Sequence, residues 1–346
     1  MPLGAKRVFR LSLTVALSLA MAYGAAMKMP YIAPIFALLL GAAPKPPMGL
    51  KGLVGVVLLV LVTTSVGLLL VPMLINYPVS ALLVVLVGLY LSNYLSINLN
   101  KGPVGAFLTV GITLISAAGL ASVEMARAVI DALVLGIGIA IICQWIIYPL
   151  FPEDAADIPN EGPAPAAAAS TWIAWRATLI VMPVYFVALT NPAMYLPMIM
   201  KSVSLGQQSS ALGARNAGQE LLGSTFLGGC FAILVWMGLG IATNLWMFFL
   251  WILLAGVYAA SKIYGVLRSR FPASFWVNAA VTMLILLGSA VQDANSGKDV
   301  YKAFFVRMAL FVVVTLYAWG ALAVLERLRV RRLSRGAGAI PVMEPR

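Results

Sequence analysis

The chain has 346 residues, of which 62% are hydrophobic and only 10% are charged, and its mean hydropathy is +0.99. A soluble domain carries about 25% charged residues, so this composition excludes a soluble protein and predicts an integral membrane protein. The net charge is +12, but the basic residues lie singly or in small groups between apolar runs, which is typical of membrane topology and not of a nucleic-acid surface. The sequence has no histidine, which excludes His-based catalysis and His metal sites. We expect neither enzyme activity nor a cofactor.

The first half of the chain contains a series of apolar runs. About 20 such residues cross the hydrocarbon core of a bilayer as a helix. A short run, Tyr31–Ala43, contains Pro34. Residues 1–150 are expected to form a first membrane unit, whose long runs are Val8–Met27, Leu50–Val71, Val79–Leu99, Val104–Ala121 and Met125–Leu150.

A linker rich in Pro and Ala, 151–171, separates the two halves. In the second half a short run, Met194–Leu205, contains Pro197. Residues 329–346 are expected to form a basic tail at the membrane surface. Residues 172–328 are expected to form a second membrane unit, whose long runs are Trp172–Leu189, Glu220–Ile241, Leu245–Leu267, Ser274–Val291 and Val300–Leu325.

The two units look like one repeat used twice. Each has a full helix, a short segment with proline, and four full helices, and Tyr31 lies where Tyr195 does. The predicted fold is therefore an all-α integral membrane protein with two parallel six-helix repeats, in which the second segment of each repeat is short and broken by proline. Small-residue patterns that permit close helix approach also match between the units, at Thr63-x-x-x-Gly67 and Thr225-x-x-x-Gly229.

The positive charges predict the topology. Six segments in each unit place both termini and the linker on one side of the membrane. Most of the 23 Lys and Arg residues then lie on that same side. The positive-inside rule assigns this side to the cytoplasm.

The paired short segments are the first candidates for a binding site. Short or Pro-interrupted segments at equivalent places of two repeats are the best sequence indication of a transporter site. They supply Tyr31 and Pro34 in the first unit, and Tyr195 and Pro197 in the second. Kinked packing helices with no role in binding are the alternative that the sequence leaves open.

Lys201 follows Pro197 by one helical turn. A lysine inside a membrane segment is costly and usually marks a pathway or a paired site. We interpret it as the cation that binds the carboxylate of a substrate. The alternative is a lysine that reaches to the cytoplasmic membrane surface.

Asp131 and Arg307 are candidates for a proton or ion pathway. Each lies about two turns into the last helix of its unit, so their depths are near-equivalent. They can pair across the interface between the repeats, or Asp131 can carry the proton, because buried carboxyl groups titrate near neutrality. The sequence equally allows that both lie in the outer headgroup zone.

Three segments resemble the fusaric acid resistance (FUSC) and aromatic acid exporter superfamily: Pro30-Tyr31-Ile32-Ala33, Gly49-Leu50-Lys51-Gly52 and Thr63–Gly67. In that family a Pro-Tyr-Trp-Ala-like turn precedes a short helix, a basic loop and a Gly-Thr-x-x-Gly helix. The resemblance covers both units, although Ile32 replaces the usual aromatic residue and the large cytoplasmic domains are missing. It implies export of small, often aromatic, organic anions across a bacterial inner membrane, commonly with a periplasmic membrane fusion protein.

Together these features predict a proton-driven inner-membrane exporter of small amphipathic or aromatic organic acids or drug-like anions. An organic-anion channel and a non-transporting membrane scaffold are the alternatives. Candidate partners are the lipid bilayer, the organic anion, a periplasmic membrane fusion protein and further copies of the chain. No nucleic-acid partner is expected.

Overall fold

The computed structural model describes residues 1–43, 45–99, 101–153, 170–209 and 214–337, and within these ranges it contains helices and no strands. Nine of the described helical segments are long and apolar enough to cross a membrane. The predicted all-α membrane fold is therefore confirmed. Most of the predicted linker, 151–171, lies outside the described residues, as does the end of the predicted tail from residue 338.

The first half begins with four helices, of which the second is short. The elements are α1 (Leu3–Gly24), the short α2 (Ile32–Ala42), α3 (Leu50–Asn76) and α4 (Pro78–Asn98). A continuous rod follows, made of α5 (Gly102–Val110), a π-helical turn η1 (Gly111–Ile115) and α6 (Ser116–Ala121). The half ends with α7 (Val123–Ile147) and the 3₁₀ turn η2 (Tyr148–Leu150).

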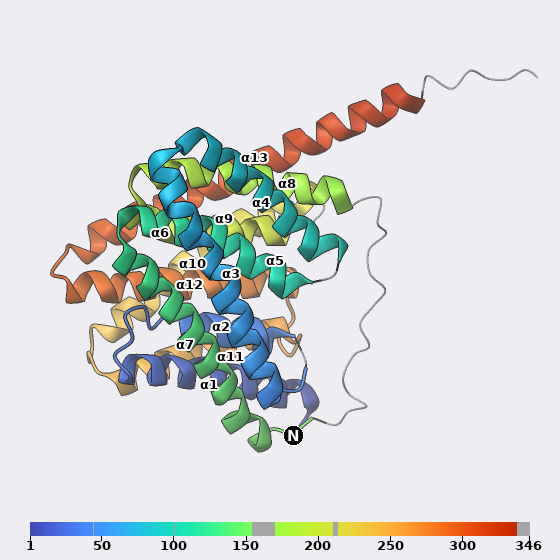
Figure 1. Cartoon of the computed structure of the whole chain (residues 1–346). Helices are drawn as coiled ribbons and strands as arrows, with labels where there is room; N and C mark the ends of the chain where they lie inside the picture. The colour runs from blue at the N-terminus through green and yellow to red at the C-terminus, as the bar shows by residue number, and fades with distance from the viewer. Residues whose placement is uncertain (44, 100, 154–169, 210–213, 338–346) are drawn as a thin grey trace, which may run out of the picture.

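The second half contains α8 (Ser170–Thr190), α9 (Pro192–Ser209), α10 (Ala214–Leu239), α11 (Leu245–Ile263), α12 (Ala273–Asn295) and α13 (Val300–Ala337). α9 is longer than the predicted run because Pro192 is its first residue, where a helix needs no N–H. α13 has 38 residues and is far longer than the roughly 20 that cross a bilayer. Its end projects from the bundle in Figure 1.

The helices run between two end faces of the bundle. At one end, the Tyr264 hydroxyl after α11 donates to the carbonyl oxygen of Gly41 in α2, and Trp145 of α7 donates to the carbonyl oxygen of Met48 before α3. We call this end the termini face, because α1 begins there and α13 leaves there (Figure 1). At the opposite face, Gln292 of α12 donates to the carbonyl oxygen of Lys28 after α1.

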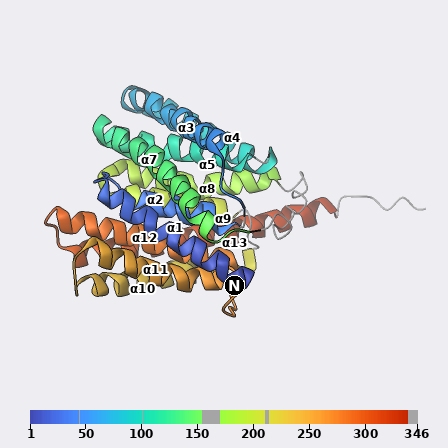
Figure 2. The ribbon, with the colours of Figure 1, turned by 90° about the horizontal axis from the view of Figure 1, so that it is seen from below.

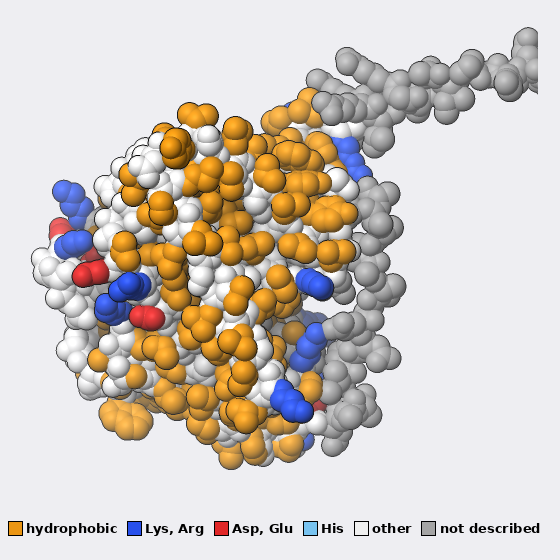
Figure 3. All heavy atoms as spheres, viewed as in Figure 1, with side chains coloured by type: hydrophobic (Ala, Val, Ile, Leu, Met, Phe, Trp, Pro, Cys, Tyr) orange, Lys and Arg blue, Asp and Glu red, His pale blue; other side chains and the backbone are white. Residues whose placement is uncertain are grey.

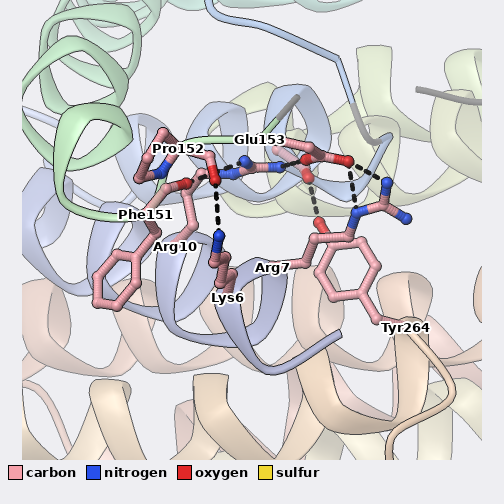
Figure 4. A network of polar contacts seen from close by, with 8 residues as sticks. Lys6, Arg7, Arg10, Phe151, Pro152, Glu153 and Tyr264 are labelled. Carbon is pink, nitrogen blue, oxygen red and sulfur yellow. Dashed lines mark hydrogen bonds and ion pairs between the residues drawn. The ribbon is translucent and has the colours of Figure 1, made fainter. Parts of the chain in front are cut away.

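A network of polar contacts at the termini face ties the segment after α7 to α1 (Figure 4). Arg7 Nε lies 2.8 Å from Glu153 Oε1, and Arg10 Nη2 lies 2.6 Å from Glu153 Oε2. Burial raises the pKa of the Glu153 carboxyl, but the hydrogen bonds and charges of the two arginines outweigh it and hold that pKa below its usual value. The start of the linker is therefore fixed against the first helix.

The two halves exchange contacts. α1 packs against α11, and α8 packs against α4, so the first helix of each half lies on the fourth helix of the other. In the same way α2 contacts α12, while α9 contacts α5 and α6. Figure 2 shows the result, with α3 and α4 at one side, α10 and α11 at the other, and α2 and α12 between them. This packing is consistent with the repeat, which stays a prediction.

Helices approach closely at two glycines, Gly67 of the first small-residue pattern and Gly228, which directly precedes Gly229 of the second. A Cβ atom on Gly67 of α3 would overlap the carbonyl oxygen of Gly111 in η1. A Cβ atom on Gly228 of α10 would likewise overlap the carbonyl oxygen of Ala279 in α12. Only glycine lets these backbones touch, which is the usual role of such residues in membrane helices.

The surface is apolar around the bundle and charged at its ends. Figure 3 shows a broad hydrophobic surface, with Lys, Arg, Asp and Glu side chains gathered at two opposite edges. Large side chains that face outward include Leu69, Val79 and Phe305, each more than 70% exposed. Such a surface requires lipid around it.

Candidate functional site

Lys201 lies in the interior of the protein, on α9. Its side chain is fully buried, with an exposed fraction of 0%. The Nζ atom lies 3.0 Å from Asn278 Oδ1 and 2.7 Å from Thr282 Oγ1, both on α12. Lys201 therefore does not reach the membrane surface, and the snorkelling alternative is wrong for this geometry.

The partners of Lys201 are themselves fixed by hydrogen bonds. Asn278 Nδ2 donates to Ser224 Oγ on α10, and the Thr282 hydroxyl donates to the carbonyl oxygen of Asn278 at 2.7 Å. These bonds turn the amide oxygen of Asn278 toward Lys201. Helices α9, α10 and α12 thus meet at one polar cluster: Lys201, Ser224, Asn278 and Thr282.

The charge of Lys201 has no internal counterion here. Both of its partners are neutral oxygens, and Lys201 forms no ion pair within the part of the chain that the structure describes. Burying an ammonium group without an anion is costly, because neutral dipoles replace its hydration only in part. The cluster is therefore suited to a bound anion.

An apolar cavity of about 530 Å³ lies beside this cluster. The wall is built mainly from the two short helices and α12, and it reaches Met48, Pro103 and Ser274 near the termini face. Met200 and Ser204 of α9 line it, whereas Lys201 on the same helix does not, and its side chain turns away from the lining toward Asn278 and Thr282. Further lining residues are Ile35 and Phe36 on α2, Ile199 and Val203 on α9, Val277 and Val281 on α12, and Phe107 on α5.

The other predicted residues of the short helices lie near the cavity but outside its lining. Tyr31 is buried before α2, and a Cβ atom on Gly288 of α12 would overlap its side chain. Pro34 is buried in the first turn of α2, so it starts that helix and does not break it. Pro197 lies inside α9, and Tyr195 packs partly buried between the two apolar clusters. Their part in binding stays a prediction.

The predicted pairing of Asp131 with Arg307 is wrong for this structure. Arg307 on α13 pairs with Asp293 on α12, through both guanidinium Nη atoms and both carboxylate oxygens. Asp131 is exposed on the outer surface of α7. The reason is local: α12 and α13 are joined by a short turn, which brings their ends together, whereas residues at equivalent depths in two repeats need not meet.

A buried polar stripe along α12 was not anticipated from the sequence. The residues Asn278, Thr282, Ser289 and Asp293 are all buried. At 3.6 residues per turn their spacings of four, seven and four place them on one side of the helix. This stripe runs from the Lys201 cluster to the Asp293–Arg307 pair. A helical projection of 273–295 would have indicated it.

The cavity does not continue to the opposite face. A second pocket of about 950 Å³ lies there, lined by the ends of α10 to α13, including Trp236, Phe248 and Asn295. The tight contact between Tyr31 and Gly288 of α12 lies between the two pockets, and the Asp293–Arg307 pair lies at the depth of the second pocket. The described structure is thus hollowed from both ends and closed in the middle.

Comparison with known proteins gives one match. A family model described as "Protein of unknown function (DUF2955)" matches residues 7–147, which cover α1 to α7. No curated protein and no solved structure matches the chain. The match is confined to the first half of the chain and assigns no activity. The resemblance to the FUSC superfamily stays a prediction. Fold and composition define a multi-pass helical membrane protein.

Proposed function

We propose that the protein transports small amphipathic organic anions, with aromatic or other apolar bodies, across the bacterial inner membrane. The direction is export, both termini are cytoplasmic, and transport is coupled to protons. Export and a periplasmic membrane fusion partner rest on the FUSC resemblance. The substrate class rests on the site.

The observation that carries the proposal is the buried Lys201 on a helix that forms part of the wall of an apolar cavity. Ligand sites of about 300–1,000 Å³ are mostly apolar with a few placed polar groups, and the cavity of about 530 Å³ fits this description. The apolar lining suits the body of an aromatic acid. The lysine suits its carboxylate, once its long side chain turns past Met200 or Ser204.

The closed centre supports a transporter that opens to one side at a time. The cavity reaches the termini face, while Tyr31 and the Asp293–Arg307 pair stand between it and the opposite face. A substrate that enters from the termini face must therefore wait for these contacts to separate. This is the alternating behaviour of transporters built from repeats.

Efflux from proteoliposomes tests the proposal. Wild-type protein is expected to move benzoate-like carboxylates and to leave their neutral amides behind. Lys201→Gln should abolish this transport, and Lys201→Arg should retain part of it, since the charge stays while the geometry changes. Lys51→Gln, at an exposed lysine of α3, is the matched control and should transport like wild type.

Two results would contradict the proposal. One is undiminished carboxylate transport by Lys201→Gln. The other is single-channel current carried by the same anions in a planar bilayer, which would make the protein an anion channel.

A further inference from the structure

Glu220 on α10 is an ionisable residue with a partly buried side chain. Its Oε2 atom is shielded from solvent and has no hydrogen-bond partner within the described residues. A carboxylate oxygen without a donor is costly inside a protein. A carboxyl group in this position is stabilised by binding a proton.

Glu220 lies at one end of a polar chain that leads to Lys201. Ser224 follows it by four residues, so the two side chains share one face of α10 about one turn apart. Ser224 Oγ accepts from Asn278 Nδ2, and Asn278 Oδ1 accepts from Lys201 Nζ. The hydrogen-bonded chain thus runs from Ser224 to Lys201, and Glu220 lies one helical turn from its Ser224 end without a hydrogen bond to it.

Other ionisable residues lie on α10 and on the helices that pack against it. α10 packs against α11, α12 and α13, and its own remaining ionisable residues are Arg215 and Cys230. Lys262 donates to the carbonyl oxygen of Arg268, Asp293 pairs with Arg307, and Glu326 pairs with Arg176. The remaining ionisable side chains described on these helices are Tyr258, Tyr301, Lys302, Tyr317, Arg327 and Arg329.

We infer that Glu220 binds one proton whenever an organic anion binds at Lys201, so that anion and proton cross the membrane together as an electroneutral pair. This inference rests on the proposed function. It assigns the coupling proton to Glu220 and takes that role from the exposed Asp131.

Charge balance predicts that the proton moves in the same direction as the anion. In the empty protein Lys201 and Glu220 form no ion pair, but an ionised Lys201 and an ionised Glu220 have charges that sum to zero. A carboxylate that enters adds one negative charge, which the low dielectric of the interior does not tolerate uncompensated. One proton from the same side then forms one O–H bond on Glu220, and the sum returns to zero. A proton is the fitting cation, because Glu220 Oε2 has no hydrogen-bond donor within the described residues and can form one O–H bond.

This sign differs from proton antiport. A proton that binds Glu220 removes a negative charge from the site and strengthens anion binding. Efflux is then driven by the anion gradient and opposed by an inward proton gradient, unlike the predicted proton-driven export, and it does not depend on the membrane potential.

The experiment uses wild-type proteoliposomes loaded with benzoate and a trapped pH-sensitive dye. One proton should leave with each anion, and the efflux rate should not change when a potassium gradient with valinomycin sets the membrane potential. Absence of proton movement, or movement in the opposite direction, would overturn the inference. Vesicles without protein give the passive flux of benzoic acid, which carries its own proton through lipid, and only the flux above that level is assigned to the protein.

Glu220→Gln then separates the inference from the proposed function, because glutamine resembles the protonated carboxyl. Benzoate should still bind and cross, but proton movement should be lost and the rate should become dependent on membrane potential. The matched control is Asp131→Asn, which should behave like wild type. Retention of proton movement by Glu220→Gln, or loss of benzoate binding by the folded variant, would overturn the role of Glu220. Failure of the proposed function shows separately, as unchanged transport in Lys201→Gln.

Discussion

Removing both partners of the Asp293–Arg307 ion pair is expected to destabilise the protein less than the sum of the two single removals. The Asp293 side chain is 5% exposed and that of Arg307 is 22% exposed. Breaking a fully buried pair costs about 3–5 kcal/mol, because one charge is left uncompensated. Arg307→Gln strands the more deeply buried group and should cost about 3 kcal/mol, whereas Asp293→Asn should cost about 2 kcal/mol, since the guanidinium still reaches water.

The double variant removes both charges and should cost only about 2 kcal/mol, which leaves a coupling energy near 3 kcal/mol. The assay is reversible unfolding by SDS in mixed micelles, followed by circular dichroism. Asp131→Asn combined with Arg307→Gln is the control pair and should be additive within about 0.5 kcal/mol. Additive losses for Asp293 and Arg307, or coupling between Asp131 and Arg307, would refute the assignment of the pair.

Two further predictions concern packing and the termini face. Gly67→Ala should cost about 3 kcal/mol or more in the same unfolding assay, because its Cβ would overlap the carbonyl oxygen of Gly111. The control is Gly55→Ala on the same helix, whose Cβ meets nothing within 4 Å and which should be neutral. Equal losses of stability in the two variants would exclude the close approach. Glu153→Gln should cost about 1–2 kcal/mol at neutral pH, because two arginines of α1 lose their acceptor. The lowered pKa of Glu153 means that its contribution is complete above the ordinary value of 4.5 and is lost as pH falls through the folded-state value, so the difference between wild type and variant should vanish in acid; a constant difference would argue against this ion pair.

The membrane architecture followed from the sequence because it depends on local composition. Runs of about 20 apolar residues must become helices in lipid, whatever they pack against. The close approach at Gly67 was likewise predictable, since small residues four apart serve one purpose in membrane helices. Even the short helices were located, although Pro34 starts α2 and does not break it.

The site was predictable only in part, because it depends on tertiary contacts. Lys201 stood out as a charge in an apolar run, but its burial is decided by Asn278 and Thr282, about 80 residues away. The repeat pattern relates Arg307 to Asp131, which lies at a near-equivalent position of the first unit. The true partner, Asp293, lies on the preceding helix of the same unit, and the repeat pattern does not indicate it. Glu220 read as the start of an apolar run, and nothing in its sequence context shows that one carboxylate oxygen is buried.

The most direct test of the account is equilibrium binding of a radiolabelled aromatic carboxylate to the purified protein. Wild type should bind the acid, and its uncharged methyl ester should not compete. Lys201→Gln should weaken binding roughly 10- to 100-fold, the loss of a charge-assisted hydrogen bond of about 1.5–3 kcal/mol. Equal affinity of wild type and Lys201→Gln for the acid, or effective competition by the ester, would contradict the claim that Lys201 binds the substrate carboxylate.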